Sequence, residues 1–319
     1  MGAEILVPAG GMSGAAPAAS RDGGRLRVAA GHAARIVLGL VFVLAGVAKA
    51  VDPAEFAFEM AGYGIVGARF SAIAAPILIA LEIALGAALL AAVHTRVTAL
   101  LSTGLMVLFL GVKSYALTQG RTDPCGCFGT YLETSPGWGV LIDCGFIAAG
   151  VLTLWGRRRS DRRENARGTL AIAGLGLLSL GLILASPSLP IDRLVTRLAV
   201  GRSLKDLGIE GKVPGQGKRL VALLDLTRPS AAETAARLNH LVEELSTREG
   251  APRVVALTPS TEGDKAAFIW TANPSFEIQP VDRPILKPLY RRLPRFFLVA
   301  EERVVAIYDG SPPPAGDLL

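Results

Sequence analysis

Residues 70–93 read FSAIAAPILIALEIALGAALLAAV, an apolar run interrupted by a single acidic residue, Glu82. A run of about 20 apolar residues is long enough to cross the hydrocarbon core of a bilayer as a helix. Similar runs lie before and after this one, near 35–51, 97–118, 138–155 and 169–187. We therefore predict an all-α transmembrane part with five spanning helices, each satisfying its backbone hydrogen bonds internally.

The overall composition agrees with a membrane protein. Hydrophobic residues make up 51% of the 319 residues, and the formal net charge is +6. In a soluble protein this charge would indicate an acidic partner. Here the arginines lie beside apolar segments, so membrane orientation explains them better. The expected partner is the lipid bilayer, and no nucleic-acid partner is predicted.

The distribution of arginines predicts the orientation. The loop at 157–168 is strongly basic, and the Ala/Gly-rich tail at 1–32, which we expect to be disordered, carries Arg21, Arg25 and Arg27. Basic segments of this kind stay in the cytoplasm. An even number of predicted spans separates the tail from the loop. Both basic segments are therefore expected on the same side of the membrane, and the two signals agree. We predict a multi-pass protein of the cell (inner) membrane whose C-terminal part is periplasmic or extracellular.

Four ionisable residues lie inside the predicted spans. With a helical rise of about 1.5 Å per residue, Lys49, Lys113 and Asp143 fall in the outer third of the membrane and Glu82 near its centre. Such groups usually face the bundle interior with a partner. One interpretation is a polar pocket leading to a proton route or a quinone-like acceptor, although the sequence defines no cofactor. In the other, the lysines extend to the interface and Glu82 stays protonated, hydrogen-bonded to a neighbouring helix. We favour interfacial lysines and leave both interpretations open for Glu82.

Two of the three cysteines lie in the outer loop Asp123-Pro124-Cys125-Gly126-Cys127-Phe128-Gly129. The outer compartment is oxidising, and a disulfide between Cys125 and Cys127 would close a small, readily reduced ring. We favour thiol exchange over a structural brace, and no metal site is predicted from two thiolates. Cys144, in the fourth helix, can either resolve a mixed disulfide or pack as a small apolar group, and we favour packing.

Three sequence elements occur together within residues 33–156: Gly46-Val47-Ala48-Lys49-Ala50-Val51-Asp52-Pro53, Leu81-Glu82-Ile83-Ala84-Leu85-Gly86 and Cys125-Gly126-Cys127-Phe128-Gly129. With these elements the segment resembles the MauE/DoxX membrane proteins. The resemblance implies a four-helix membrane unit with redox-associated work. Its motif positions would be Cys125, Cys127, Lys49 and Glu82. In methylamine utilisation, MauE is implicated with a thioredoxin-like partner in maturing a disulfide-rich dehydrogenase subunit. The implied partner is therefore an extracytoplasmic client or a separate thioredoxin-like protein.

The fifth helix at 169–187 is followed by a segment of different character. Over residues 201–319 the apolar runs are shorter and charged residues are again frequent, which predicts a soluble domain on the outer face. Strands and helices are expected to alternate and to end in a hairpin, which indicates a small α/β sandwich. The expected strands are 219–226, 253–257, 276–280, 293–299 and 304–308, and the expected helices are 231–246, 264–272 and a turn at 285–292.

This order of elements resembles a thioredoxin-like domain of the membrane-anchored type. Pro294, before a strand, matches the position of that family's cis-proline. Where the family carries Cys-x-x-Cys, this chain reads Thr227-Arg228-Pro229-Ser230. Exchange requires a thiolate, so the site is degenerate and the domain is expected to be a redox-dead docking module. Ser230 or Thr227 is also suited to cap the following helix.

Two functions of different classes follow from these features. The favoured one is thiol–disulfide redox maturation of an extracytoplasmic client by Cys125 and Cys127, with the outer domain holding the client; whether the protein is itself an enzyme stays open. The alternative is a non-catalytic membrane scaffold or assembly factor with a structural loop disulfide. A transporter is disfavoured, since the sequence shows no repeat with paired, interrupted helices.

Overall fold

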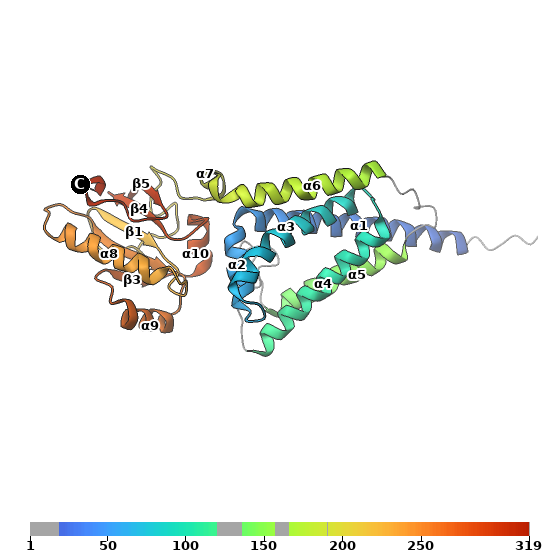
Figure 1. Cartoon of the computed structure of the whole chain (residues 1–319), viewed down its shortest axis with the longest axis horizontal. Coiled ribbons are helices and arrows are strands. Elements are labelled where there is room, and N and C mark those ends of the chain that lie inside the picture. Colours follow the sequence, from blue (N-terminus) through green and yellow to red (C-terminus); the bar gives the residue numbers. More distant parts are fainter. Residues whose placement is uncertain (1–18, 120–135, 157–165, 190, 319) are drawn as a thin grey trace, which may run out of the picture.

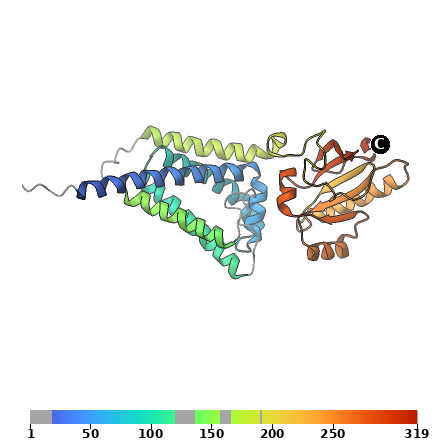
Figure 2. The ribbon, with the colours of Figure 1, turned by 180° about the vertical axis from the view of Figure 1, so that it is seen from behind.

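The chain folds into a helical bundle and a separate α/β domain, placed end to end (Figure 1). The structure is a computed structural model that describes residues 19–119, 136–156, 166–189 and 191–318. The beginning of the first helix and the α/β domain lie at opposite ends of the bundle, and the view from behind shows the same arrangement (Figure 2).

Five helices of the bundle are long and apolar enough to cross a membrane, which confirms the predicted spans. α1 packs against α3 and α5, α4 packs against α5, and α6 packs against α3. Many leucines and isoleucines on the outside of the bundle are exposed, as expected of side chains that face lipid. The helices are α1 (Ala19–Val51), α3 (Ala68–Leu90), α4 (Thr95–Thr118), α5 (Pro136–Trp155) and α6 (Ala166–Ala185).

Glycines allow α1 and α3 to approach each other closely. A Cβ atom added at Gly86 would lie 2.8 Å from the carbonyl oxygen of Gly39, and one added at Gly46 would lie 2.7 Å from Cγ1 of Ile83. Small residues at such contacts are the usual means by which membrane helices pack tightly. Gly46 and Gly86 belong to the two helical motifs noted above, so those motifs bring the two helices together.

The first helix begins earlier than predicted. Residues 19–32, expected to be part of a disordered tail, are helical in α1. Within this stretch Gly31 lies close to Gly156, and this contact packs the part of α1 around Gly31 against the end of α5.

A further short helix, α2 (Pro53–Gly62), was not predicted. Asp52 caps it by accepting a hydrogen bond from the backbone N–H of Glu55 at 3.1 Å, and proline at the first position suits a helix start. α2 lies between the bundle and the α/β domain (Figure 1).

The α/β domain contains a mixed five-stranded sheet in the order β3-β2-β1-β4-β5. The first three strands are parallel, and β4 and β5 are antiparallel to their neighbours. Glu301 and Glu302 have positive φ angles, as the two central residues of a tight hairpin turn require. The strands are β1 (Arg219–Leu223), β2 (Arg253–Thr258), β3 (Glu277–Pro280), β4 (Arg295–Ala300) and β5 (Arg303–Asp309).

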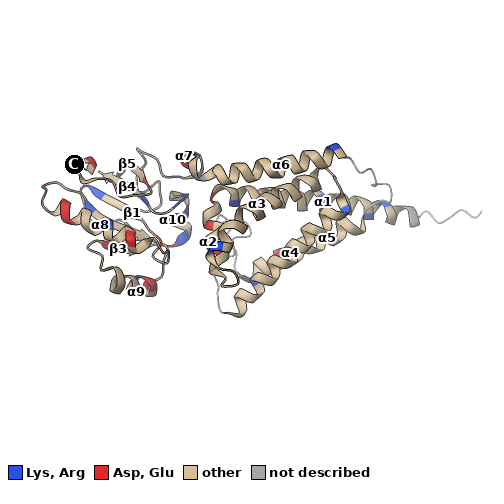
Figure 3. Cartoon of the chain, in the orientation of Figure 1, with Lys and Arg blue, Asp and Glu red and all other residues tan. Residues whose placement is uncertain are grey.

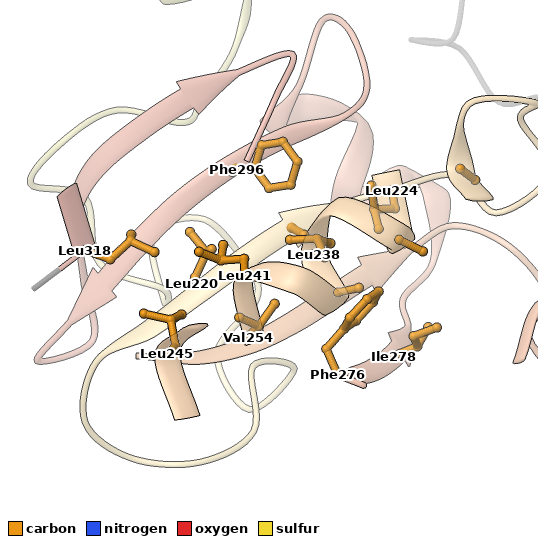
Figure 4. Packing of buried hydrophobic residues seen from close by; sticks show 14 of the residues in the cluster. Leu220, Leu224, Leu238, Leu241, Leu245, Val254, Phe276, Ile278, Phe296 and Leu318 are labelled. Atoms are coloured by element: carbon orange, nitrogen blue, oxygen red, sulfur yellow. The ribbon is translucent and has the colours of Figure 1, made fainter. Parts of the chain in front are cut away.

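Both faces of this sheet are covered. On one face α8 (Ala231–Ser246) and α9 (Glu262–Ala272) pack against the sheet, as the close view shows for α8 (Figure 4). On the other face, side chains from 198–213 and α10 (Arg283–Leu286) cover Val221 and Leu223. The domain therefore has a core of its own and resembles thioredoxin-like folds, as predicted. The remaining helical turns are η2 (Ser186–Ser188), α7 (Asp192–Val195), η3 (Lys287–Leu289) and η4 (Ala315–Leu318).

Candidate functional site

Lys49 and Glu82 form a buried ion pair between α1 and α3. Lys49 Nζ lies 2.6 Å from Glu82 Oε1, and the two side chains are 1% and 2% exposed. The same ammonium group lies 5.0 Å from the ring centre of Phe56 and 5.1 Å from that of Phe109. Aromatic faces stabilise a desolvated cation. The charge of Lys49 is therefore held inside the protein by one carboxylate and two rings.

Lys113 and Asp143 form a second buried pair, between α4 and α5, with Nζ 2.6 Å from Oδ2. The prediction that Lys49 and Lys113 extend to the membrane interface is therefore wrong. The physical reason is that each lysine meets a carboxylate of a neighbouring helix within the bundle, which is how charged groups at such depth are usually stabilised.

The carboxylates of the two pairs adjoin each other. Glu82 and Asp143 both line a cavity of about 10 Å³, with Phe42, Met106 and Phe146 among its other walls. Oε2 of Glu82 is buried and has no hydrogen-bond partner among the described residues. This volume suits about one water molecule. The structure thus brings together the four predicted intramembrane residues, in two neighbouring pairs.

Two of the three predicted thiols, Cys125 and Cys127, lie outside the described residues. Their segment connects α4 to α5. Cys144 lies in α5 as a free, exposed thiol, so the favoured interpretation of it as a buried packing residue is wrong. It follows Asp143, whose side chain points inward, and the neighbouring position on a helix faces another way. The alternative role of Cys144 in resolving a mixed disulfide stays a prediction.

The stretch at 227–230, predicted to be a degenerate thioredoxin-like site, is organised by Asp225, which lies two residues after the end of β1. Its Oδ1 accepts hydrogen bonds from the backbone N–H of Thr227 at 3.1 Å and from the Thr227 hydroxyl at 2.6 Å. Ser230 stands at the N-cap position of α8 but makes no side-chain capping bond. The predicted capping by Ser230 or Thr227 is therefore wrong, because the Thr227 hydroxyl is turned to Asp225. The Leu293–Pro294 peptide bond is cis, the isomer that the resemblance implies.

The degenerate site contacts the membrane domain through ion pairs. Arg228 pairs with Glu55 of α2, and Arg283 NH2 lies 2.8 Å from Glu55 Oε1 and 3.2 Å from Glu59 Oε1. Lys287 Nζ lies 4.0 Å from Asp52 Oδ2. Figure 3 shows α2 and α10 facing each other where the two domains meet. We call these six residues the interdomain charge cluster: Asp52, Glu55, Glu59, Arg228, Arg283 and Lys287.

Burial and charge alter the ionisation of this cluster. Burial raises the pKa of Glu59 to about 7, with repulsion from Glu55 acting in the same direction and Arg283 opposing it. Burial also raises the pKa of Asp52. In Arg228 and Arg283 burial disfavours the charge, yet attraction to Glu55 raises the pKa of both guanidinium groups. The arginines stay charged, and Glu59 is the group that changes its charge near neutral pH.

A cavity of about 520 Å³ lies beside the cluster, between the two domains. The membrane domain contributes residues of α2 and, from α4, Ala116. The outer domain contributes the degenerate site and the start of α9. The lining residues are Phe58, Glu59, Gly62, Tyr63, Ala116, Asp225, Thr227, Pro259, Ser260, Thr261, Asp264 and Arg283.

The interdomain charge cluster was not predicted from the sequence. A signal was present, because Asp52, Glu55 and Glu59 are spaced by three and four residues and so lie on one face of a helix. Their partner Arg228 lies far away in the chain, within Thr227-Arg228-Pro229-Ser230, so the pairing itself leaves no local signal in the sequence.

Fold and site together define a multi-pass membrane protein with an α/β domain that resembles thioredoxin-like folds. Residues 27–156, less than half of the chain, match the family model of the methylamine utilisation protein MauE. This match confirms the resemblance drawn from the motifs of the membrane unit. None of the curated proteins matches the sequence.

Two solved structures show similarity to the chain. A thioredoxin-related protein from Neisseria meningitidis serogroup B is 14% identical, with 31% of this chain and 77% of that chain covered and a TM-score of 0.27. A thioredoxin-like protein from Bacteroides caccae ATCC 43185 is 13% identical, with 75% of this chain and 77% of that chain covered and a TM-score of 0.24.

Proposed function

We propose that this protein exchanges disulfides with an extracytoplasmic client, with Cys125 and Cys127 as the exchange pair and the outer domain as a docked binding module. The interdomain charge cluster carries the proposal. It holds Thr227 and Arg228 against the end of the bundle at which α4 ends. Ala116, in the last turn of α4, lines the same cavity as Thr227. In the chain, the segment that carries Cys125 and Cys127 begins directly after α4, so it starts from the end of the bundle at which the two domains meet.

The two domains have different roles in this proposal. Residues 227–230 contain no cysteine, so the outer domain binds the client, and the loop that carries Cys125 and Cys127 supplies the thiols. For a reducing step, the thiolate of one loop cysteine attacks a client disulfide and forms a mixed disulfide. The second cysteine then attacks that bond and releases the client thiolate, so the client is reduced and the loop pair oxidised. The reverse sequence oxidises the client.

The proposed location follows from the arginines. The basic segments at 1–32 and 157–168 favour a cytoplasmic N-terminus, with the outer domain in the periplasm or outside the cell. The five spans support this, since an odd number puts the two ends on opposite sides. Similarity to MauE makes methylamine utilisation the first metabolic setting to examine.

A non-catalytic scaffold is the second candidate function. The observation that favours it is the interface itself, because Glu55 is only 6% exposed at its side chain and binds two guanidinium groups of the outer domain. Such contacts suit a fixed assembly surface. In that case the loop disulfide would brace the outer rim and would resist mild reductants.

Thiol trapping separates the two functions. Intact cells expressing the Cys144→Ser chain are treated with a membrane-impermeant maleimide before and after mild reduction, and mass shifts at Cys125 and Cys127 are read. Exchange predicts two blocked thiols that mild reductant releases. If the two thiols are free throughout, or are released only after denaturation, the proposed disulfide exchange is wrong and the scaffold function remains.

A matched comparison tests the client. Cells carrying Cys125→Ser with Cys127→Ser are compared with cells carrying the unaltered chain, and the thiol state of extracytoplasmic proteins is measured. At least one client should change its thiol state in the double variant and keep it with the unaltered chain. Identical thiol states in both strains would contradict the proposed exchange.

A further inference from the structure

The small cavity between the two buried ion pairs has two kinds of wall. Its volume is about 10 Å³, and Glu82 of α3 and Asp143 of α5 contribute carboxylates to it. The other lining side chains are apolar and come from α1, α4 and α5. They are Val41, Phe42, Ala45, Met106 and Phe146. The cavity therefore adjoins two carboxylates and is otherwise enclosed by apolar side chains.

One oxygen of Glu82 requires a hydrogen-bond donor. Oε1 accepts a hydrogen bond from Lys49 Nζ at 2.6 Å, whereas Oε2 is buried and has no partner among the described residues. The Glu82 side chain is only 2% exposed, so bulk water does not solvate this oxygen. A buried acceptor of this kind is costly without a donor. The adjoining cavity is the place from which a donor can reach it.

The charges and the donor atoms of the lining favour a neutral ligand. Glu82 is paired with Lys49, and Asp143 is paired with Lys113, so each pair carries no net charge. A hard cation such as Mg²⁺ or Ca²⁺ takes about six or more oxygen ligands. Of the side chains that line this cavity, only the two carboxylates supply oxygen. A metal ion would therefore lack most of its coordination shell.

The size of the cavity selects a water molecule. A cavity must provide about 10–15 Å³ to hold one water, and a buried water needs at least about two polar partners. The cavity of about 10 Å³ meets the first condition and excludes larger molecules. The two carboxylates meet the second. A water molecule has two O–H donors, one for each of these acceptors.

We propose that this cavity is a binding site for one buried water molecule, which donates one hydrogen bond to Glu82 Oε2 and the other to the Asp143 carboxylate. The water links the ion pair of Lys49, between α1 and α3, to that of Lys113, between α4 and α5. All four helices then share one polar network. None of the cysteines takes part, so the inference goes beyond the proposed disulfide exchange and does not depend on it.

The network reaches both parts of the chain to which a function is assigned above. The carbonyl group of Lys49 accepts a hydrogen bond at 3.2 Å from the backbone N–H of Asp52, which belongs to the interdomain charge cluster. Lys113 and Asp143 lie on the two helices that the segment with both loop cysteines connects. The water therefore joins the helix that leads into α2 to the helices at either end of the thiol-bearing segment.

A high-resolution experimental structure tests the water directly. The full chain is crystallised in a lipidic mesophase, and difference density is calculated with no atom placed in the cavity. We expect one peak at hydrogen-bond distance, about 2.5–3.0 Å, from Glu82 Oε2 and from an oxygen of Asp143. The lack of a peak, or a direct contact between the two carboxyl groups, would overturn the proposal.

Two substitutions at one position test whether the cavity requires a donor. Ala45→Ser brings a hydroxyl group to the wall in place of the water, whereas Ala45→Cys adds a side chain of similar size that is a much weaker donor. Thermal unfolding in detergent should show a midpoint higher by about 2 °C or more for the serine variant. A midpoint for Ala45→Cys at or above that of Ala45→Ser would mean a dry cavity and would contradict the proposal.

The same two substitutions at Ala72 are the matched control. Ala72 is exposed on α3 and does not line the cavity. At this lipid-facing position a hydroxyl group has no acceptor to satisfy, so the cysteine variant should be at least as stable as the serine variant. The order of the two residues is therefore expected to reverse between positions 45 and 72. The same order at both positions would show that the carboxylates do not call for a donor.

Salts distinguish water from a small monovalent cation. The thermal midpoint of the unaltered chain is compared in sodium, potassium and ammonium chloride at equal ionic strength. Water predicts equal midpoints in the three salts. A midpoint that rises with one cation in the unaltered chain, and not in the chain carrying Lys49→Met with Glu82→Gln, would assign the cavity to that cation and overturn the water. The paired substitution removes the Glu82 carboxylate and leaves no unpaired charge.

Discussion

Glu55, in a short helix of the membrane domain, forms an ion pair with Arg228, which stands inside the degenerate Thr-Arg-Pro-Ser motif of the outer domain. The two residues are 173 positions apart in the chain. The loop between β1 and α8 is thus bound to α2 of the membrane domain through Arg228.

Replacing Glu55 should undock the outer domain. Glu55→Ala removes the carboxylate that Arg228 and Arg283 share at a largely buried interface. Arg228 keeps Asp225 and Arg283 keeps Glu59, so we expect a cost of about 1–3 kcal/mol. Hydrogen exchange should accelerate in 227–235 and 283–289. Glu233→Ala, which breaks the exposed pair with Arg237, is the matched control and should leave exchange unchanged.

Docking should strengthen as the pH falls toward 5. The pKa of Glu59 is about 7 in the docked state, against an ordinary value of 4.5, so docking favours the protonated carboxyl. This contribution is complete below about pH 4.5 and is lost as the pH rises through 7. From the gap between the two values, its size is on the order of 3 kcal/mol. The measurement is hydrogen exchange in 283–289 at several pH values, corrected for the intrinsic rate.

The Glu59→Gln variant is the control for this pH dependence. A glutamine keeps the size of the side chain and can donate or accept hydrogen bonds without titrating. Asp52, whose pKa burial also raises, contributes in the same direction, so a smaller residual slope is expected. An unaltered slope in the variant would assign the pH dependence to groups other than Glu59.

Hydropathy was sufficient to predict the five spans, because an apolar run of membrane length has few other stable arrangements. Hydropathy was not sufficient to predict the partners of the two buried lysines. Sequence position gives the depth of Lys49 and Lys113, whereas their partners depend on how each helix is rotated about its axis. That rotation is set by contacts such as Gly86 with Gly39, which no periodicity reveals. Docking of the two domains depends on residues far apart in the chain, so the sequence could not predict this contact either.

Substitution of Gly86 should destabilise the bundle. Gly86→Ala places a methyl group 2.8 Å from backbone atoms of Gly39 and Val43, so α1 and α3 must separate. Overpacking of this kind costs about 1–3 kcal/mol. Gly104→Ala is the matched control, since no atom lies within 4 Å of its added Cβ. Thermal unfolding in detergent should show a lower midpoint for the first variant only, and equal midpoints would argue against a close contact at Gly86.

The Lys49–Glu82 pair should behave as a coupled unit. Lys49→Met leaves Glu82 buried opposite an apolar side chain, and Glu82→Leu leaves an unpaired ammonium group, so each should destabilise the bundle by about 3–5 kcal/mol. The double variant removes both charges and should be much more stable than the sum of the two single effects predicts. Unfolding of the four chains by steric trapping in bicelles gives the coupling free energy. Additive effects would mean that the two groups do not stabilise each other, and the lysine would then have to be neutralised by another group or by solvent.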